Sequence, residues 1–279
     1  MLEFTKVEGL ANDFILLDRR EGGPTLHADQ VRQLCHRRRG VGADGVLTLL
    51  PPERGADVRL LIQNADGSVP EMCGNGLRCV IRYLEHEGPM SKVRVETGAG
   101  FREGWSAPEG DITVTLGEGR VLSPQIPVQL GEASLFGVEV DMGNPHLVVF
   151  PTVAAAAGRS MTELADRYGP ELELHPRFPE RVNVGFATFA DDGFELVVFE
   201  RGAGRTEACG TGAGACALAA QYVGRWTAGP TVPVLLPGGP MKVGLPTPER
   251  REVLITGPAH IVFRGAWRAP SDERAAWIG

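Results

Sequence analysis

Long hydrophobic runs, an export signal and an excess of basic residues are all missing from this 279-residue sequence. Without a run of about 18 apolar residues, no membrane-spanning helix is expected. The opening MLEFTKVEGL has neither a basic start nor an apolar stretch, so it does not resemble a secretory signal, and a cytoplasmic protein is expected. Lys and Arg number 28 against 35 Asp and Glu, a net charge of −7 that argues against a nucleic-acid partner.

Lysine and the usual metal-binding patterns are also scarce. The lysines are Lys6, Lys92 and Lys242, and none lies in a segment typical of a cofactor pocket, whereas pyridoxal phosphate needs a lysine for its Schiff base. The five cysteines are odd in number, lack CxxC spacing and have no nearby pair of histidines. We therefore expect no disulfide framework, no zinc or other metal site, and no organic cofactor.

Short apolar segments bounded by Gly, Pro, Asn and Asp dominate the chain and predict many strands. They lie at residues 14–18, 46–50, 58–64, 93–97, 112–116, 147–150, 194–200, 232–236 and 253–256. Helical patterns occur at residues 28–38, 76–88, 161–172 and 212–224. The Pro-containing segment 121–130 interrupts the strand pattern and is expected to be a crossover between two halves. The predicted fold class is mixed α/β (α+β).

One pattern occurs twice. EMCGNGLRC and EACGTGAGAC each place a cysteine, Cys73 or Cys209, before Gly, a small polar residue and Gly, 136 residues apart. Nine residues before each cysteine a strand-like run ends, at Asn64 in one copy and at Glu200 in the other. Further upstream, NDFILL resembles NPHLVV. Three features in the same order predict two pseudo-symmetric halves, each built from a strand, a turn, a cysteine and a helix.

A cysteine at the start of a helix is suited to acid–base chemistry. The free N–H groups and the positive end of the helix dipole favour a thiolate over a thiol. The same N–H groups can bind a carboxylate, and flanking glycines let a ligand approach the backbone. Cys73 and Cys209 are therefore the candidate catalytic residues, whereas Cys35, Cys79 and Cys216 are interpreted as apolar residues of helix faces.

Two such cysteines on opposite sides of one small molecule would form a two-base racemase or epimerase. A thiolate removes the α-proton from one face, and a thiol delivers a proton to the other face, so the configuration inverts. With no cofactor to take up the charge, helix N–H groups have to stabilise the carbanion, and closure of two domains has to exclude water.

The motifs resemble those of the diaminopimelate epimerase family, the pyridoxal-independent isomerases of bacterial lysine and cell-wall biosynthesis. In the family order, the chain contains FTKVEGLANDF, RRRGVGADG, NADGSVPEMCGNGLRC, VDMGNPHLVVF, RVNVGF, ERGAGRTEACGTGAGA, LPGG and GPAHIVFRG. The resemblance covers essentially the whole chain. It implies interconversion of LL- and meso-2,6-diaminopimelate without a cofactor.

The resemblance also implies roles for particular residues. Cys73 and Cys209 are implied as the catalytic pair, and His146 as a neighbour that supports Glu200. The residues implied to bind the substrate are Asn12, Asn64, Gly74, Asn75, Asn144, Asn183, Glu200, Arg201, Gly210 and Thr211. The backbone of the two glycines and of the residue after each is implied to bind the reacting carboxylate. A guanidinium such as that of Arg201 suits the distal carboxylate, because it can donate two parallel hydrogen bonds.

The domain organisation that the resemblance implies is two similar domains, each a mixed β-sheet curled into a barrel around a central helix. The expected boundaries are 1–117 and 118–263, with 264–279 returning to the first domain. A homodimer is implied as well. The family commonly has Glu in the position of Arg205, which is expected to face solvent here.

Two other functions stay open. A histidine- or proline-type racemase could use the same scaffold, but proline racemases usually have His where Asn75 stands, and Asn75 with Arg201 favours a substrate with a second polar end. A thiol–disulfide or ligand-binding protein would belong to a different class. The lack of CxxC spacing and the presence of both cysteines argue against that class.

Overall fold

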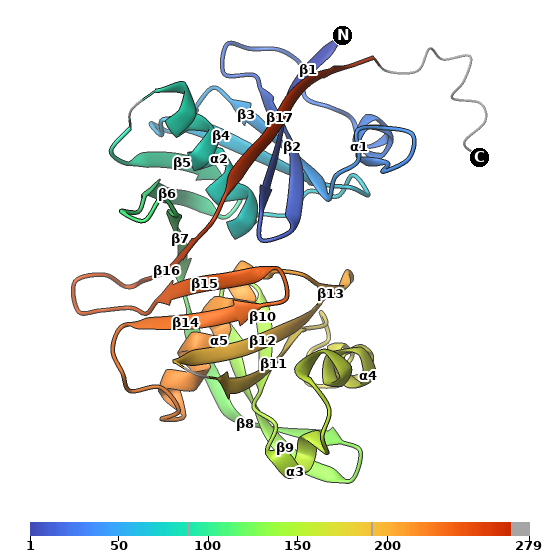
Figure 1. Ribbon diagram of the computed structural model, residues 1–279, viewed down its shortest axis with the longest axis vertical. Helices are drawn as coiled ribbons and strands as arrows, with labels where there is room; N and C mark the ends of the chain where they lie inside the picture. Colours follow the sequence, from blue (N-terminus) through green and yellow to red (C-terminus); the bar gives the residue numbers. More distant parts are fainter. Residues whose placement is uncertain (89, 191, 269–279) are drawn as a thin grey trace. The chain divides into compact units, whose positions relative to one another are not determined.

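The computed structural model describes residues 1–88, 90–190 and 192–268 of the chain. Contacts between Cα atoms divide it into two compact units (Figure 1). Of the described residues, those within 1–103 and 259–268 form the first unit, and those within 104–258 form the second. Within the described ranges, no helix is both long and apolar enough to cross a membrane.

A mixed β-sheet forms the first unit. Its elements are β1 (Leu2–Gly9), β2 (Asn12–Asp18), α1 (Ala28–Cys35), β3 (Gly45–Leu50), β4 (Val58–Asn64), α2 (Gly74–Glu87), β5 (Val93–Thr97) and β17 (His260–Trp267). Strand β17 pairs antiparallel with β1, and β1 pairs antiparallel with β2. The next pairs are β2–β3 parallel, β3–β4 antiparallel and β4–β5 parallel. In Figure 1 the red strand β17 runs along β1, so the chain returns late to the sheet in which it begins.

The strands of the second unit also pair in both parallel and antiparallel directions. Strand β6 (Gly100–Ser106) leads into this unit, which begins at Gly104. Its other elements are β7 (Ile112–Glu118), β8 (Arg120–Leu130), β9 (Ala133–Asp141), β10 (Pro145–Val149), α3 (Val153–Ala156), α4 (Met161–Glu173), β11 (Asn183–Ala190), β12 (Gly193–Glu200), β13 (Gly204–Thr206), α5 (Gly210–Tyr222), β14 (Thr231–Leu236), β15 (Gly239–Gly244) and β16 (Glu252–Gly257). Strands pair in the order β8, β9, β10, β11, β12, β14, β15, β16 and β7.

The same topology occurs in both units, as the internal repeat predicts. In the first unit β1 and β2 are antiparallel, β2 and β3 parallel, β3 and β4 antiparallel, and β4 and β5 parallel. Strands β9, β10, β11, β12 and β14 repeat these orientations in the second unit. Helices α2 and α5 occupy equivalent places, each before the last strand of its series. The mixed α+β fold with two pseudo-symmetric halves is therefore confirmed.

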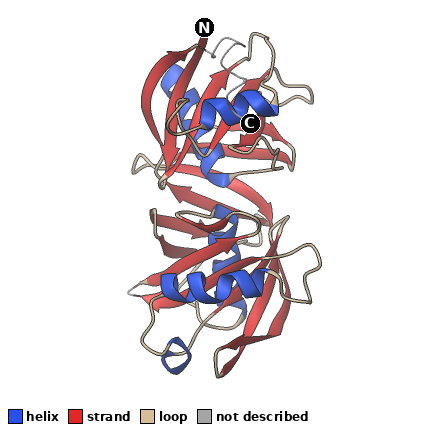
Figure 2. Ribbon diagram, turned by 90° about the vertical axis from the view of Figure 1, so that its right-hand side faces the viewer, coloured by secondary structure: helices blue, strands red, loops and turns tan. Residues whose placement is uncertain are grey.

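Helix α5 contacts most strands of the second unit, and Figure 2 shows helices, in blue, both among and in front of the red strands of each unit. The strands that α5 contacts are β8 to β12 and β14 to β16. Small residues make this close approach feasible. A Cβ atom on Gly214 would lie 2.9 Å from Met142 Cε and 3.3 Å from Leu116 Cδ1. Helix α4 packs against β11 and β12 and buries Leu164 and Leu172.

The predicted strands and helices form with ends within three residues of those expected. The prediction of a crossover at 121–130 is wrong, because this segment belongs to β8, which pairs antiparallel with β9. Its register shifts on either side of Ser123, next to Pro124. Proline lacks a backbone N–H and is tolerated at irregular edge positions of a sheet.

The compact units divide at 103/104 and 258/259, whereas the expected boundaries are 117/118 and 263/264. The first difference arises because β7 pairs with β16 of the second unit, from Glu118 opposite Glu252 to Ile112 opposite Gly257. The second arises because β17 begins at His260 and pairs with β1. Of the segment expected to return to the first domain, residues 269–279 lie outside the described residues.

Candidate active site

A cysteine caps the N-terminus of the equivalent helix in each unit. Cys73 precedes α2 and Cys209 precedes α5, and both have extended backbone conformations. The backbone N–H of Gly76 donates to Cys73 Sγ at 3.4 Å, and that of Gly212 donates to Cys209 Sγ at 3.4 Å. The sulfur atoms thus take the place of the side-chain oxygen of an ordinary N-cap.

The glycines of the repeat let each helix begin directly against its sheet. A Cβ atom on Gly76 would lie 2.9 Å from Leu47 Cδ2, and one on Gly212 would lie 2.8 Å from Val198 Cγ2. Helices α2 and α5 begin at Gly74 and Gly210, which places the predicted carboxylate-binding residues in their first turns. The N–H groups of a first turn have no partner within the helix.

Asn12 lies beside Cys73 in the first unit. Asn12 Oδ1 is 4.0 Å from Cys73 Sγ and accepts a 3.3 Å hydrogen bond from Asn75 Nδ2. The two-residue turn before Asn12, Leu10 and Ala11, has positive φ angles of 58° and 61°, which match the twist of a tight hairpin. Burial of Leu10, 3% exposed, helps to hold this costly conformation. The structure therefore brings Asn12, Asn75 and Cys73 together.

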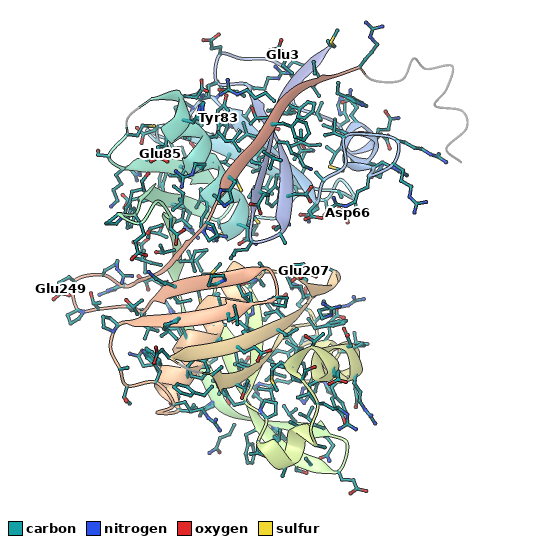
Figure 3. All side chains as sticks on the ribbon, viewed as in Figure 1. Glu3, Asp66, Tyr83, Glu85, Glu207 and Glu249 are labelled. Atoms are coloured by element: carbon teal, nitrogen blue, oxygen red, sulfur yellow. The ribbon has the colours of Figure 1, made fainter. Side chains whose placement is uncertain are left out.

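Asn64 lies at the exposed end of β4. Its Nδ2 donates to Ser68 Oγ at 3.0 Å, within the turn that contains Asp66, labelled in Figure 3. Asn64 pairs with Gly45 in the β3–β4 register. Its neighbour Ala65 donates its backbone N–H to Asp44 O at 2.9 Å, which connects this turn to the residue that holds Asn12.

Asp44, in the loop before β3, binds Asn12 directly. Asp44 Oδ2 accepts hydrogen bonds from Asn12 Nδ2 at 2.8 Å and from the backbone N–H of Asp13 at 3.0 Å. Asp44 Oδ1 pairs with Arg37 Nη2 at 2.6 Å. The sequence feature that could have indicated this role is the position of Asp44 in RRRGVGADG, immediately before a predicted strand.

Polar residues gather around Cys209 in the second unit. We call this group, which consists of Asn144, Glu200, Thr206, Cys209 and Thr211, the half-site of the second unit, and the corresponding group of Asn12, Cys73 and Asn75 the half-site of the first. Thr206 Oγ1 donates to Glu200 Oε1 at 2.5 Å. Burial raises the pKa of the Glu200 carboxyl, against the opposing effect of hydrogen bonds from Thr206 and Cys209. Burial, followed by the charge of Glu200, raises the pKa of the Cys209 thiol well above its ordinary value, although Thr211 and the Gly212 N–H oppose this. Desolvation thus outweighs the helix N-terminus at Cys209, contrary to the expectation from sequence that this position favours a thiolate.

Removing the charge of Glu200 is expected to make Cys209 more reactive. In Glu200→Gln the carboxylate no longer disfavours the thiolate, so the pH midpoint of alkylation should fall. Thr211→Val should move the midpoint in the opposite direction, because it removes a hydrogen bond that stabilises the thiolate. Iodoacetamide labelling of Cys209 as a function of pH, quantified by peptide mass spectrometry, measures both shifts. Shifts of the same sign in the two variants would contradict this account.

Asn144, the residue before β10, is the counterpart of Asn12, and His146 contacts it. His146 Nε2 is 3.1 Å from Asn144 Oδ1, and Asn144 Nδ2 donates to Thr211 Oγ1 at 3.4 Å. A carbonyl oxygen only accepts, so this contact requires the tautomer with a proton on Nε2. The predicted neighbour His146 is therefore placed against Asn144. Burial, and then the charge of Arg201, lowers the pKa of the His146 imidazole to about 3.

The buried His146 is expected to make the folded protein sensitive to acid. Its pKa is about 3 when folded and about 6.5 when unfolded. The unfolded chain therefore binds the extra proton between these values, so stability is complete above pH about 6.5 and falls toward pH about 3, by up to about 1.4 kcal/mol per pH unit. Urea unfolding of wild type and His146→Gln between pH 4 and 7 should give a shallower pH dependence in the variant. Parallel curves would rule out His146 as the source.

Asn183 and Arg201 lie next to each other at the end of the half-site. Asn183 Oδ1 accepts the backbone N–H of Arg201 at 3.0 Å, and Asn183 Nδ2 donates to Pro145 O at 2.9 Å. A cavity of about 370 Å³ is lined by Asn144, Arg177, Arg181 and Arg201, among other residues.

The three arginines of this cavity differ in their partners. Arg177 pairs with Glu139 at 2.7 Å and Arg181 with Glu173 at 3.3 Å. Arg201 Nη1 donates to the carbonyl of Glu180 at 3.1 Å, and among the described residues its guanidinium pairs with no carboxylate. Arg201 is therefore the guanidinium of this cavity that is suited to an anionic ligand.

Two further side chains hold the turn between β12 and α5. Glu173 Oε1, on α4, accepts the backbone N–H of Gly202 at 2.8 Å. Arg205 Nε donates to Asp166 Oδ1 of α4 at 2.8 Å, and Arg205 Nη1 lies 3.9 Å from Glu207 Oε1. Arg205 thus links β13 to α4. Neither Glu173 nor Thr206 had a signal in the sequence, because their role depends on packing between segments far apart in the chain.

Each lysine forms an ion pair with a carboxylate: Lys6 with Asp13, Lys92 with Glu103 and Lys242 with Glu109. Across the ranges that the structure covers, no group of three or more His, Cys, Asp or Glu side chains is arranged to hold a metal ion. The polar groups around the two cysteines are instead amides, hydroxyls, one carboxylate and helix N–H groups.

The fold is similar to that of solved structures described as a proline racemase and a hydroxyproline epimerase. A crystal structure of a probable proline racemase from Agrobacterium radiobacter K84 is similar with a TM-score of 0.71, covering 99% of this chain and 95% of that one at 16% identity. The family model described as diaminopimelate epimerase matches residues 4–122 and 138–262. This chain belongs to the diaminopimelate epimerase family.

Relatives named diaminopimelate epimerase match nearly the whole chain. The protein from Synechococcus sp. (strain JA-3-3Ab) is 43% identical over 95% of this chain and 97% of its own length. The one from Cyanothece sp. (strain PCC 7425) is 41% identical over 95% of this chain and 99% of its own length.

Proposed function

We propose that this protein is a diaminopimelate epimerase that interconverts LL- and meso-2,6-diaminopimelate without a cofactor. The observation that carries the proposal is the repeated half-site in a member of this family. In both units a cysteine sulfur accepts the N–H of the third helical residue at 3.4 Å. The reaction supplies precursors for lysine and peptidoglycan.

Cys73 and Cys209 are proposed to act as two bases on opposite faces of the substrate α-carbon. The thiolate of one removes the α-proton, and the electron pair of the C–H bond passes to the α-carbon and its carboxylate. The thiol of the other cysteine donates its proton to the opposite face and becomes a thiolate. The configuration is then inverted, and exchange of protons with solvent restores the starting pair.

Stabilisation of the carbanion is assigned to the helix N-termini. Backbone N–H groups of Gly74, Asn75, Gly210 and Thr211 lie in the first turns of their helices, where N–H groups point toward the helix N-terminus. Together with the positive ends of two helix dipoles, they would stabilise the charge that develops on the carboxylate.

Recognition of the distal amino-acid group is assigned to the second unit. Arg201 would bind the distal carboxylate, because its guanidinium lines the cavity without a carboxylate partner among the described residues. Glu200 would bind an ammonium group, and the cation would favour the ionised form of this buried carboxyl. Asn64, Asn144 and Asn183 would supply further amide contacts.

A biosynthetic role on a small metabolite is consistent with a cytoplasmic enzyme, which we propose here together with a homodimeric state. Light scattering during size-exclusion chromatography would measure the mass in solution directly.

The enzymatic activity is tested by incubating the purified protein with LL-diaminopimelate, without pyridoxal phosphate or added metal. Formation of the meso isomer is expected, and turnover of proline or histidine is not. Racemisation of either of these in place of diaminopimelate would overturn the proposal.

A further inference from the structure

The Asn12 amide has two orientations that would present opposite chemistry to Cys73. One presents the carbonyl oxygen, which accepts a hydrogen bond from a thiol. The other presents the NH₂ group, which donates to a thiolate. The orientation therefore affects whether the protonated or the ionised form of Cys73 is favoured.

We infer that Asp44 is a positioning residue that holds the Asn12 amide with its carbonyl oxygen toward the Cys73 thiol. The inference deepens the proposed function, on which it rests for its catalytic meaning. An ionised carboxylate accepts hydrogen bonds but cannot donate them, so Asp44 Oδ2 selects the NH₂ group of Asn12, at 2.8 Å. Asn12 Oδ1 then faces Cys73 Sγ at 4.0 Å.

Neighbouring groups fix Asp44 on several sides. The backbone N–H of Asp44 donates to Asp13 O at 2.9 Å, and the carbonyl of Asp44 accepts the N–H of Ala65 at 2.9 Å. Its Oδ1 atom pairs with Arg37 Nη2 at 2.6 Å, which leaves Oδ2 for Asn12 and the Asp13 N–H. At the other end of the Asn12 amide, away from Asp44, Asn75 Nδ2 donates to Asn12 Oδ1 at 3.3 Å. This hydrogen bond also favours the orientation with the carbonyl oxygen toward Cys73.

The half-site of the second unit has the opposite arrangement. There the imidazole of His146 holds the carbonyl oxygen of Asn144 at 3.1 Å, so the Asn144 NH₂ group faces Thr211 Oγ1 at 3.4 Å. The pseudo-symmetric asparagines thus turn different atoms toward their helix N-termini. Because Asn12 presents a hydrogen-bond acceptor, it favours the protonated form of Cys73. The Cys73 thiolate, once formed, is therefore a stronger base than it would be beside a hydrogen-bond donor. A strong base suits the removal of a weakly acidic α-proton.

Other charged or titratable side chains lie near these residues in the first unit. Arg78 and Arg82 are on α2 itself, Lys6, Glu8, Asp13 and His260 are on the strands that contact α2, and Arg37 pairs with Asp44. Asp44 itself has a charge, so its removal could act through space as well as through Asn12. The test has to separate these two effects.

The pH midpoint of Cys73 alkylation by iodoacetamide, measured by peptide mass spectrometry, makes this separation and needs no substrate. Asp44→Ala should lower the midpoint by about 0.5–1 pH unit, the range expected for one hydrogen bond. Asp44→Asn removes the charge but retains an oxygen acceptor, so it should lower the midpoint by less. In the Asn12→Ala background, Asp44→Ala should lose most of its effect. Asp57→Ala is the matched control, because Asp57 Oδ2 also accepts a backbone N–H, that of Arg94 at 2.7 Å, and should leave the midpoint unchanged.

An equal shift for Asp44→Ala in both backgrounds would show that Asp44 acts by charge alone and would overturn the inference. An unchanged midpoint in folded Asp44→Ala would overturn it as well. If Asp44→Ala fails to fold, Asp44→Ser replaces it in both backgrounds, because serine is shorter but retains a polar side chain in the loop. Failure of the epimerase assay would bear on the proposed function and leave these alkylation results unaffected.

Discussion

Replacing either Cys73 or Cys209 by serine is expected to reduce kcat for diaminopimelate epimerisation by about 10²–10⁴-fold, the usual contribution of a positioned acid or base. Serine fits the same N-cap position, where its oxygen can accept the N–H of Gly76 or Gly212. Its hydroxyl, however, is a far weaker acid than a thiol. The loss should therefore come from chemistry, with the unfolding transition nearly unchanged.

Both variants should lose activity to a similar degree, because in a two-base reaction each cysteine acts as base in one direction and as acid in the other. Cys79→Ala and Cys216→Ala are the matched controls, since they remove fully buried thiols from α2 and α5 themselves. These controls should retain activity. In heavy water, wild-type product should contain solvent deuterium at the inverted carbon. Near-normal turnover in either serine variant would contradict the mechanism.

Replacing Arg201 by alanine is expected to lower kcat/KM by about 10–100-fold, the effect of losing charge-assisted hydrogen bonds worth about 1.5–3 kcal/mol. Most of the change should appear in KM, because the distal carboxylate is bound equally in the ground state and the transition state. Arg201→Lys should restore part of the loss, since an ammonium keeps the charge but not the planar pair of donors.

Arg177 provides the control for this prediction because it lines the same cavity but already pairs with Glu139 at 2.7 Å. Arg177→Ala should change kcat/KM much less than Arg201→Ala. Steady-state kinetics with LL-diaminopimelate measure both variants. Equal losses would show that the cavity responds to its total charge and that Arg201 has no specific role.

Much of the architecture was predictable because it depends on short local sequence patterns. Apolar runs between turn residues predicted the central strands, and the repeated cysteine–glycine motif predicted two equivalent halves, which β2–β5 and β10–β14 then show. The failure at β8 has a physical cause. Pro124 disrupts a strand pattern locally, while pairing with β9, which forms a hairpin with it, restores the strand.

The candidate site was predictable to the extent that its residues follow strands or begin helices. Asn12, Cys73 and Asn75 lie together, as do Glu200 and Cys209. The supporting groups were not predictable. Asp44, Thr206 and Glu173 act on residues that come near only after the sheets form, and a single carboxylate or hydroxyl in a loop has many other uses.

The sequence by itself determined that two cysteines begin equivalent helices. An N-cap depends on a few neighbouring residues, and the following glycines let each helix begin close to the strands it packs against. Only the tertiary structure decided the environment of each thiol. Burial and Glu200 raise the pKa of Cys209 despite its helix N-terminus, and Asp44 and His146 orient two equivalent asparagines in opposite ways. Desolvation and hydrogen-bond direction depend on groups brought together from distant segments, so no local pattern encodes them.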